Sequence, residues 1–157
     1  MIRPRITSAA GFRSRRSVQG ISLLEVLVSV VVLSIGLLGV AAMQTVALRG
    51  GQSSLESSQA TIQTTAIIEA MRANPAAGAA YNVAMTCAVP AGGTQAQNDV
   101  RDWISSLKST IGTGPATDTT TCGSIANCPA NCTITVQWDD ARAGGGNQRQ
   151  MTTVTRI

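Results

Sequence analysis

The feature that most constrains this chain is an apolar segment of 23 residues, Ile21 to Met43, which carries a single charged side chain, Glu25. A helix needs about 20 apolar residues to cross the hydrocarbon core of a bilayer, so this segment is long enough to span a membrane. Five arginines and no acidic residue precede it within residues 1–20. Because basic residues before an apolar helix stay in the cytoplasm, we expect the residues after Met43 to lie on the other side of the membrane.

The basic character of the chain belongs to this N-terminal stretch. The whole chain has 12 basic and 8 acidic residues and a net charge of +4, but without the five N-terminal arginines seven basic residues face eight acidic ones, a net of −1. Nucleic acid is therefore an unlikely partner. The absence of histidine excludes a His-based triad, and no nucleotide-binding or hydrolase motif is found. We expect no catalytic residue, no cofactor and no metal.

Three kinds of sorting signal share this arrangement. An ordinary secretory signal would be cut after Ala42, and a twin-arginine signal could be read at Arg15–Arg16. The third possibility is a cut between Gly20 and Ile21, which leaves the apolar helix on the mature protein. A carboxylate within a spanning helix costs about 2.5–3.5 kcal/mol on insertion scales, and a disposable signal has no use for it. Glu25 therefore favours the third possibility.

Residues 20–28, GISLLEVLV, resemble the class III signal and N-methylation segment of type IV pilins. The resemblance implies that a prepilin peptidase cuts after Gly20 and methylates the new amine of Ile21. It also implies that Glu25 neutralises the N-terminal amine of a neighbouring subunit during assembly, which agrees with the rule that a buried charge must be paired. The alternative is a plain signal anchor in which Glu25 snorkels or takes up a proton. Gly36 and Gly39 could allow close helix contacts.

Beyond Met43 the sequence predicts that the helix continues to Asn74, because Pro75 disfavours helical geometry in the residue before it. Leu48, Leu55 and Ile62 recur every seven residues, with smaller residues (Gln59, Ala66, Ala70, Ala73) in the same stripe and Ile67 and Met71 beside it. We expect this stripe to pack on the protein's own domain, although it would also suit a coiled coil. Arg49, Glu56, Glu69 and Arg72 fall outside the stripe.

The rest of the chain predicts a small domain of α+β type. Val83, Met85, Cys87 and Val89 alternate like a strand with one buried face, and Asn98 is the expected cap of a helix that ends near Gly112. Residues 113–130 are predicted to form a loop, followed by a strand at 134–138, a Gly-rich turn at 139–147 and a last strand at 151–157. The expected fold is pilin-like, with a long N-terminal helix packed on a small antiparallel sheet.

Four cysteines, Cys87, Cys122, Cys128 and Cys132, follow the membrane segment and are expected in an oxidising periplasm. Two disulfides are predicted, and four cysteines allow three pairings. We prefer Cys87–Cys122 with Cys128–Cys132, because the first pair would tie the early strand to the long loop. A zinc site is the alternative, but the gaps of five and three residues do not match Cys-x-x-Cys.

Other charged residues predict little chemistry. Asp139 and Asp140 could hold calcium with Asn147, but a solvated hairpin loop is favoured. The basic pairs Arg101 with Lys108 and Arg142 with Arg149 are expected on solvated faces.

Three further features narrow the resemblance: the segment Met71–Pro75 followed by Tyr81, an Asp-x-x-x-Trp helix at Asp99–Trp103, and Trp138–Asp140 at a strand end. They resemble the PilV-type minor pilins, which are called pilus modification proteins. The resemblance implies the inner membrane and then the pilus as location, and four segments: a cleaved leader 1–20, an assembly helix 21–43, its amphipathic continuation 44–74 and a periplasmic head 75–157. The implied partners are prepilin peptidase, other minor pilins, the major pilin and the inner-membrane assembly platform.

Three other functions stay open at this point. A type II secretion pseudopilin would have the same N-terminus, and the residues around Pro75 argue mildly against it. A binding module would use the segment 113–132 as an adhesive or DNA-contacting tip. An exported enzyme would be released by a cut after Ala42.

Overall fold

The computed structural model describes residues 20–157, and the chain divides into two compact units, residues 1–40 and 41–157. Apart from Gly20, the predicted leader and its twin-arginine alternative lie outside the described residues. Helix α1 (Leu23–Ala73) belongs to both units: its residues 23–40 lie in the first, and its residues 41–73 lie in the second. The observed helix ends one residue before the predicted end at Asn74.

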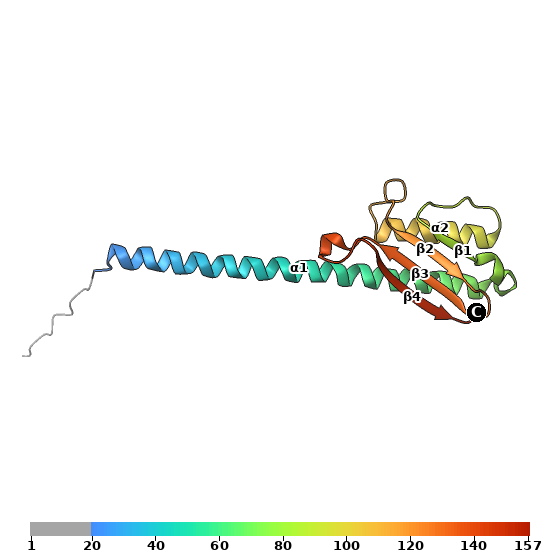
Figure 1. Cartoon of the computed structure of the whole chain (residues 1–157), viewed down its shortest axis with the longest axis horizontal. Coiled ribbons are helices and arrows are strands. Elements are labelled where there is room, and N and C mark those ends of the chain that lie inside the picture. Colours follow the sequence, from blue (N-terminus) through green and yellow to red (C-terminus); the bar gives the residue numbers. More distant parts are fainter. Residues whose placement is uncertain (1–19) are drawn as a thin grey trace, which may run out of the picture. The chain divides into compact units, whose positions relative to one another are not determined.

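The second unit adds a four-stranded sheet and a second helix to its part of α1 (Figure 1). The 3-10 helix η1 (Pro75–Tyr81) follows α1 and leads into β1 (Val83–Thr86), α2 (Gln95–Thr110), β2 (Cys122–Ala126) and β3 (Cys132–Trp138). A short 3-10 helix, η2 (Ala141–Ala143), then connects β3 to β4 (Arg149–Thr155). The strands lie in the order β1-β2-β3-β4 and every neighbouring pair is antiparallel. The predicted α+β fold is confirmed.

One face of the sheet carries the core. Strand β3 alternates strictly, with Ile134, Val136 and Trp138 buried, as the period of two requires. On β2, a Cβ atom at Gly123 would lie 2.6 Å from the Trp103 ring, so α2 packs directly on the sheet where a side chain is missing. The register places Gly123 beside Val136, and both helices therefore cover the same face as the buried residues of β3.

Helix α1 buries a different stripe from the predicted one. Leu48, Leu55 and Ile62 are 75%, 54% and 58% exposed, so the prediction that they pack on the domain is wrong. The buried positions are Glu56, Ala60, Thr64, Ile67, Ile68 and Met71. The buried residues at 60 and 64 are small, and the larger apolar side chains enter the core only near the C-terminal end of α1. The heptad pattern belongs to a second apolar face, which the domain leaves open.

The predicted strand around Val83 is shorter than expected. It ends at Thr86, its register with β2 shifts between Val83 and Thr86, and Met85 and Val89 are exposed. The expected alternation to residue 89 is therefore wrong, because the chain leaves the sheet before the disulfide at Cys87.

Helix α2 begins four residues earlier than predicted. Its cap is Thr94, whose Oγ1 accepts from the Gln97 backbone N–H at 3.4 Å while the Gln97 side chain accepts from the Thr94 N–H at 2.9 Å. This reciprocal pair is a capping box. Asn98 lies inside the helix, where its amide bonds back to Gly93.

Strand β2 lies within the segment predicted to be a loop. It pairs with β3 along its whole length and is one of the two inner strands of the sheet. The prediction for residues 113–130 is therefore wrong over Cys122–Ala126. Ile125 is the only large aliphatic residue of this strand, so its sequence pattern is weak.

Both disulfides of the head are formed, Cys87–Cys122 and Cys128–Cys132. This is the pairing that the sequence analysis preferred. The first bridge joins the end of β1 to the start of β2 and encloses all of α2. Because all four sulfurs are in bridges, they form no thiolate zinc site.

Candidate processing and assembly segment

The residues at the predicted cleavage position precede the first helix. Gly20, Ile21 and Ser22 are non-helical and exposed, and α1 begins at Leu23. Ser22 caps the helix: its Oγ accepts from the Leu24 N–H at 3.3 Å, and its carbonyl accepts from the Glu25 N–H at 3.0 Å. These bonds satisfy N–H groups that a helix start would otherwise leave without partners. The peptide bond between Gly20 and Ile21 is therefore outside the helix and open to a peptidase.

Glu25 is the acidic residue of the first turn of α1. A negative charge at this position interacts favourably with the partial positive charge of the helix N-terminus. Other polar side chains in the apolar part bond to their own helix, as Ser29 does to the Val26 carbonyl at 2.8 Å and Ser34 to the Val30 carbonyl at 2.7 Å. Within residues 20–157, no side chain forms a hydrogen bond or ion pair with the Glu25 carboxylate, which is free to accept a partner from another molecule.

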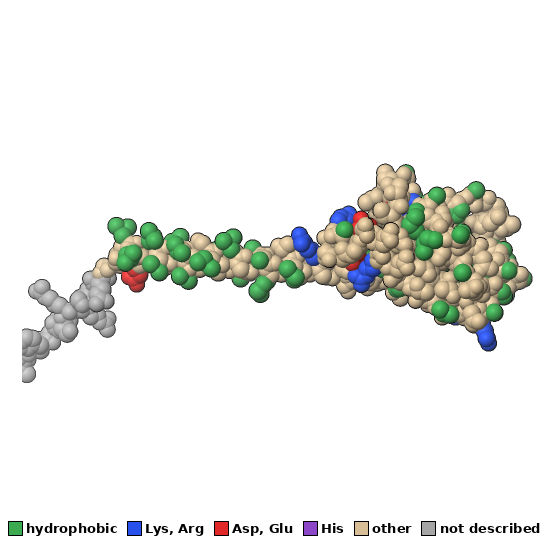
Figure 2. All heavy atoms as spheres, viewed as in Figure 1, with side chains coloured by type: hydrophobic (Ala, Val, Ile, Leu, Met, Phe, Trp, Pro, Cys, Tyr) green, Lys and Arg blue, Asp and Glu red, His purple; other side chains and the backbone are tan. Residues whose placement is uncertain are grey.

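The apolar side chains of the first unit have no partner within the described chain. Its helix is long and apolar enough to cross a membrane, and none of its most apolar stretch is buried (Figure 2). A core helix of a soluble protein would be mostly buried, whereas this helix leaves its apolar side chains open to lipid or to other helices. Cβ atoms built at Gly36 and Gly39 would meet nothing within 4 Å. Any close contact that these glycines allow is therefore made to another molecule.

The N-terminal segment matches a known family model. Residues 15–41 match the family model of the prokaryotic N-terminal methylation motif. The match contains Gly20, Ile21 and Glu25 together with most of the exposed apolar helix. No curated protein and no solved structure matches the chain. The motif supports a protein of the type IV pilin or pseudopilin class. It suggests a structural protein, fits membrane anchoring, and implies processing by a prepilin peptidase and assembly with other pilins.

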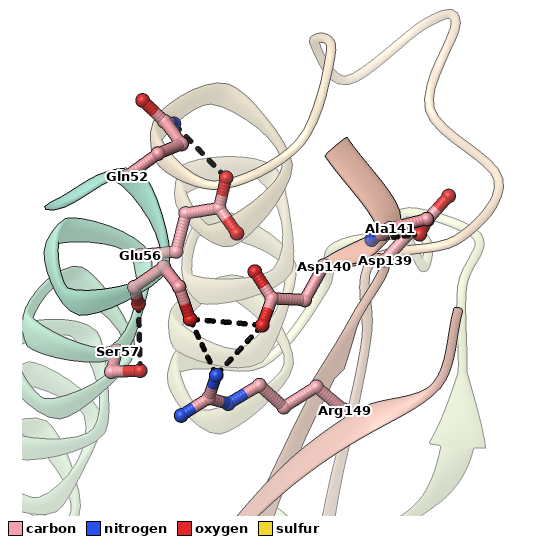
Figure 3. Close-up of polar contacts among 8 residues, drawn as sticks. Gln52, Glu56, Ser57, Asp139, Asp140, Ala141 and Arg149 are labelled. Atoms are coloured by element: carbon pink, nitrogen blue, oxygen red, sulfur yellow. Dashed lines mark hydrogen bonds and ion pairs between the residues drawn. The ribbon is translucent and has the colours of Figure 1, made fainter. Parts of the chain in front are cut away.

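The second unit contains a buried ionic cluster that the sequence analysis placed in solvent. Asp140 is 1% exposed, and its Oδ2 accepts from the Arg149 guanidinium at 2.7 Å and from the Ser53 hydroxyl at 2.9 Å (Figure 3). Arg149 also lies over the Trp138 ring, with Cζ at 5.8 Å from its centroid. Asp140 is thus not in a solvated hairpin loop. Arg149 is 44% exposed, as predicted for a solvated face, and pairs with the buried Asp140. The cluster joins α1 to the β3–β4 connection.

The contacts of Asp140 favour its ionised form. Burial raises its pKa, but hydrogen bonds from Arg149 and Ser53 and the attraction of the Arg149 charge outweigh burial and lower the pKa. The neighbouring Asp139 accepts from the Ala141 N–H at 2.8 Å. Within residues 20–157, no three acidic or cysteine side chains are grouped to hold a metal ion.

The other predicted basic pair, Arg101 and Lys108, does not share one solvated face. Lys108 is 3% exposed and donates to the Cys87 carbonyl, so the prediction of a solvated face is wrong for this residue. It holds α2 against the segment that carries the long-range disulfide. Arg101 is partly exposed and pairs with its neighbour Asp102 at 2.8 Å, as a solvated residue can.

The segment after Pro75 fixes the C-terminal end of α1. Tyr81 is fully buried, and its hydroxyl contacts the Ala70 carbonyl at 3.3 Å and donates to Asp99 on α2. Burial and the bond to Asp99 raise the pKa of Tyr81, so the phenol stays protonated. The features that resembled minor pilins, Pro75 with Tyr81 and Asp99, therefore form one joint between α1 and α2.

Sequence reasoning missed Glu56 as a buried residue. It is 4% exposed, and its Oε1 accepts from the Gln52 amide at 3.0 Å. The available signal was the spacing of Glu56, Ala60 and Thr64 every four residues, which marks one face of a helix. That face contains no large aliphatic residue until Ile67. The more apolar heptad stripe was therefore predicted to be the buried one.

Proposed function

We propose that the chain is a minor pilin of a type IV pilus, of the PilV type, that works by packing rather than by catalysis. A prepilin peptidase cuts after Gly20 and methylates Ile21. The protein waits in the bacterial inner membrane with residues 75–157 in the periplasm and then joins other minor pilins in a complex that primes assembly or modifies the pilus. It contacts the major pilin and the inner-membrane assembly platform during this transfer.

The observation that carries the proposal is the methylation motif at residues 15–41 together with the exposed state of the helix that it covers. Gly20 and Ile21 precede the helix and are accessible. Glu25 stands in the first turn, where the methylated amine of a neighbouring subunit could pair with it. In a low-dielectric surrounding such a pair is much stronger than in water, and a lone carboxylate would be costly.

A second feature supports assembly through α1. Leu48, Leu55 and Ile62 form an open apolar row on the face that the head does not cover. Single exposed apolar residues need no explanation, but three at a seven-residue spacing match the contact pattern between helices. This row suits packing against the helix of another subunit after extraction from the membrane.

The structure gives less support to the tip-binding alternative. Its predicted loop contains β2, an inner strand, so residues 122–126 are not free to contact a ligand. A pseudopilin of a type II secretion system would share the N-terminal segment, and the joint at Tyr81 favours the minor-pilin proposal only through its resemblance.

Glu25→Ala tests the role of the carboxylate. The mature protein should accumulate in membranes with its leader removed, but its amount in sheared pili should fall by at least tenfold. The matched control is Glu69→Ala, because Glu69 is an exposed acid of the same helix that pairs with Arg72 at 2.8 Å. Incorporation of the Glu25→Ala protein at the control level would contradict the proposed charge pairing.

A further inference from the structure

Basic side chains gather at the end of the second unit that carries the β3–β4 connection (Figure 2). They belong to Arg49 of α1, Arg142 of η2 and Arg149 at the start of β4. Arg149 donates to the Ser53 hydroxyl, and Arg49 precedes Ser53 by four residues, so Arg49 lies one turn away on the same face of α1. Arg142 follows Asp140 by two residues, and Asp140 accepts from Ser53. The three cations therefore lie around one stretch of α1.

Two of these arginines have no counter-charge in the described chain. Arg49 and Arg142 are exposed, and within residues 20–157 neither forms an ion pair or a side-chain hydrogen bond. Arg149 is 44% exposed and pairs with Asp140. It bonds both Ser53 and Asp140 through Nη1, and no other nitrogen of its guanidinium has an acceptor within the described residues. All three guanidinium groups can therefore bind a further acceptor.

The acids of the same region lie mostly beneath the surface. Glu56 and Asp140 are 4% and 1% exposed (Figure 3). Asp139 is partly exposed, and its Oδ1 accepts from the Ala141 N–H. The formal charges of three arginines and three acids balance. A ligand that approaches this end of the unit nevertheless meets the guanidinium groups before it meets the two buried carboxylates.

The position of the arginines along α1 brings them within reach of a membrane surface. The predicted membrane segment ends at Met43, and Arg49 follows it by six residues, which is about 9 Å along a helix. The headgroup layer adds about 5–7 Å to each side of the hydrocarbon core. Helical side chains lean toward the N-terminus of their helix, and arginine extends its charged head toward the interface. Arg49 can therefore reach lipid phosphates while Met43 stays in the hydrocarbon core.

We propose that Arg49, Arg142 and Arg149 form a docking surface for anionic phospholipids of the bilayer that holds the N-terminal helix. Guanidinium groups bind phosphate through parallel hydrogen bonds, and anionic lipid supplies the counter-charge that Arg49 and Arg142 lack. The short distance from Met43 favours lipid over an acidic protein as the partner. The docking surface rests on the proposed function only in the membrane placement of residues 21–43. It holds the head against the bilayer until the protein leaves the membrane.

Energy transfer from the tryptophans to a dansyl-labelled lipid tests the docking. The full-length protein would be reconstituted into vesicles of phosphatidylcholine alone or of equal parts of phosphatidylcholine and phosphatidylglycerol. Arg149 lies over the Trp138 ring, so docking brings this donor close to the labelled surface. We expect higher transfer in the anionic vesicles. The increase should disappear at about 1 M salt, where the Debye length is about 3 Å.

Arg49→Gln and Arg142→Gln remove charges that form no ion pair or side-chain hydrogen bond within residues 20–157, so the head should keep its fold. Each should lower the ratio of docked to undocked heads in anionic vesicles about fivefold, and the double variant about 25-fold. Arg156→Gln is the matched control, because Arg156 is exposed and follows β4 at the end opposite to Arg149. It should give the transfer of the wild type.

The outcomes separate the docking from the proposed function. Equal transfer in neutral and anionic vesicles would overturn the docking and leave an acidic protein surface as the partner of these arginines. An increase that the double variant retains in full would also overturn it. Protein that does not stay with the vesicles at all would overturn both the docking and the membrane-anchored function.

Discussion

Loss of the Cys87–Cys122 disulfide should destabilise the head more than loss of Cys128–Cys132. The bridges close chain segments with separations of 35 and 4 residues. In the chain-entropy model a crosslink removes about 2.1 + 1.5R ln n cal/mol/K from the unfolded state, where n is the loop length. At 25 °C this corresponds to about 3.8 kcal/mol for the long loop and about 1.9 kcal/mol for the short one.

The comparison is well controlled because the bridges lie in one small domain and three of their four cysteines, Cys122, Cys128 and Cys132, are buried. Each bridge would be removed as a pair of alanines in the full-length chain. Urea unfolding in detergent micelles would be followed through Trp103 and Trp138, which are both buried and report on the head. We expect the Cys87→Ala/Cys122→Ala protein to be less stable than the other variant by about 2 kcal/mol.

The opposite order would refute this reasoning. If Cys128→Ala/Cys132→Ala cost as much or more, packing of the buried sulfurs and not the length of the closed loop would govern the stability of the head. Cys128 Sγ lies 4.0 Å from Met71 Sδ, which makes packing loss at this bridge the physical alternative.

Three further perturbations test the packing, the ionic cluster and the open face of α1. Gly123→Ala should lower the free energy of unfolding by about 1–3 kcal/mol through overpacking, because its Cβ would lie 2.6 Å from the Trp103 ring. Urea unfolding measures this loss, with Gly146→Ala as the control because a Cβ there meets nothing within 4 Å. The pKa of Asp140 is lowered by its partners despite burial. Its contribution to stability is therefore present above about pH 4 and is lost as the pH falls through the pKa of the folded protein. Asp140→Asn should make acid unfolding less steep, which checks the direction of this pH dependence. Leu55→Ser should change the unfolding free energy by less than about 0.5 kcal/mol but reduce recovery in sheared pili.

Each of these has a clear failing outcome. Unchanged stability of Gly123→Ala would mean that α2 does not press on β2 as described. An acid-unfolding curve for Asp140→Asn as steep as that of the wild type would remove Asp140 from the acid-sensitive groups. A large loss of stability in Leu55→Ser, comparable to the about 2–5 kcal/mol expected for Ile67→Ala, would mean that this face is buried within the head.

The long helix and the best-formed strand were predictable because their signals are local. An apolar run of 23 residues can only be helical in a membrane, and Pro75 limits where the helix can end. Strand β3 has large residues at every second position, Ile134, Val136 and Trp138, and this pattern has one interpretation. The disulfide pairing followed from the expected neighbourhood of the early strand and the later segment.

The errors came from features that depend on tertiary packing. Helix α1 has two candidate faces, the Leu55 face and the Glu56 face, and the head covers the less apolar one. Strand β2 has Gly123 where a large residue would signal a strand, because Trp103 fills that space. Asp140 and Arg149 are nine residues apart in a Gly-rich stretch, which local pattern assigns to solvent. Only the fold brings Ser53 and Glu56 to them from α1.

The N-terminus of the mature protein tests the central proposal most directly. Protein purified from membranes would be analysed by intact mass and N-terminal sequencing. We predict a chain that begins at Ile21, carries one methyl group on its amine and contains 137 of the 157 residues. A soluble periplasmic protein that begins at Met43, or a membrane protein with its leader still attached, would contradict the account.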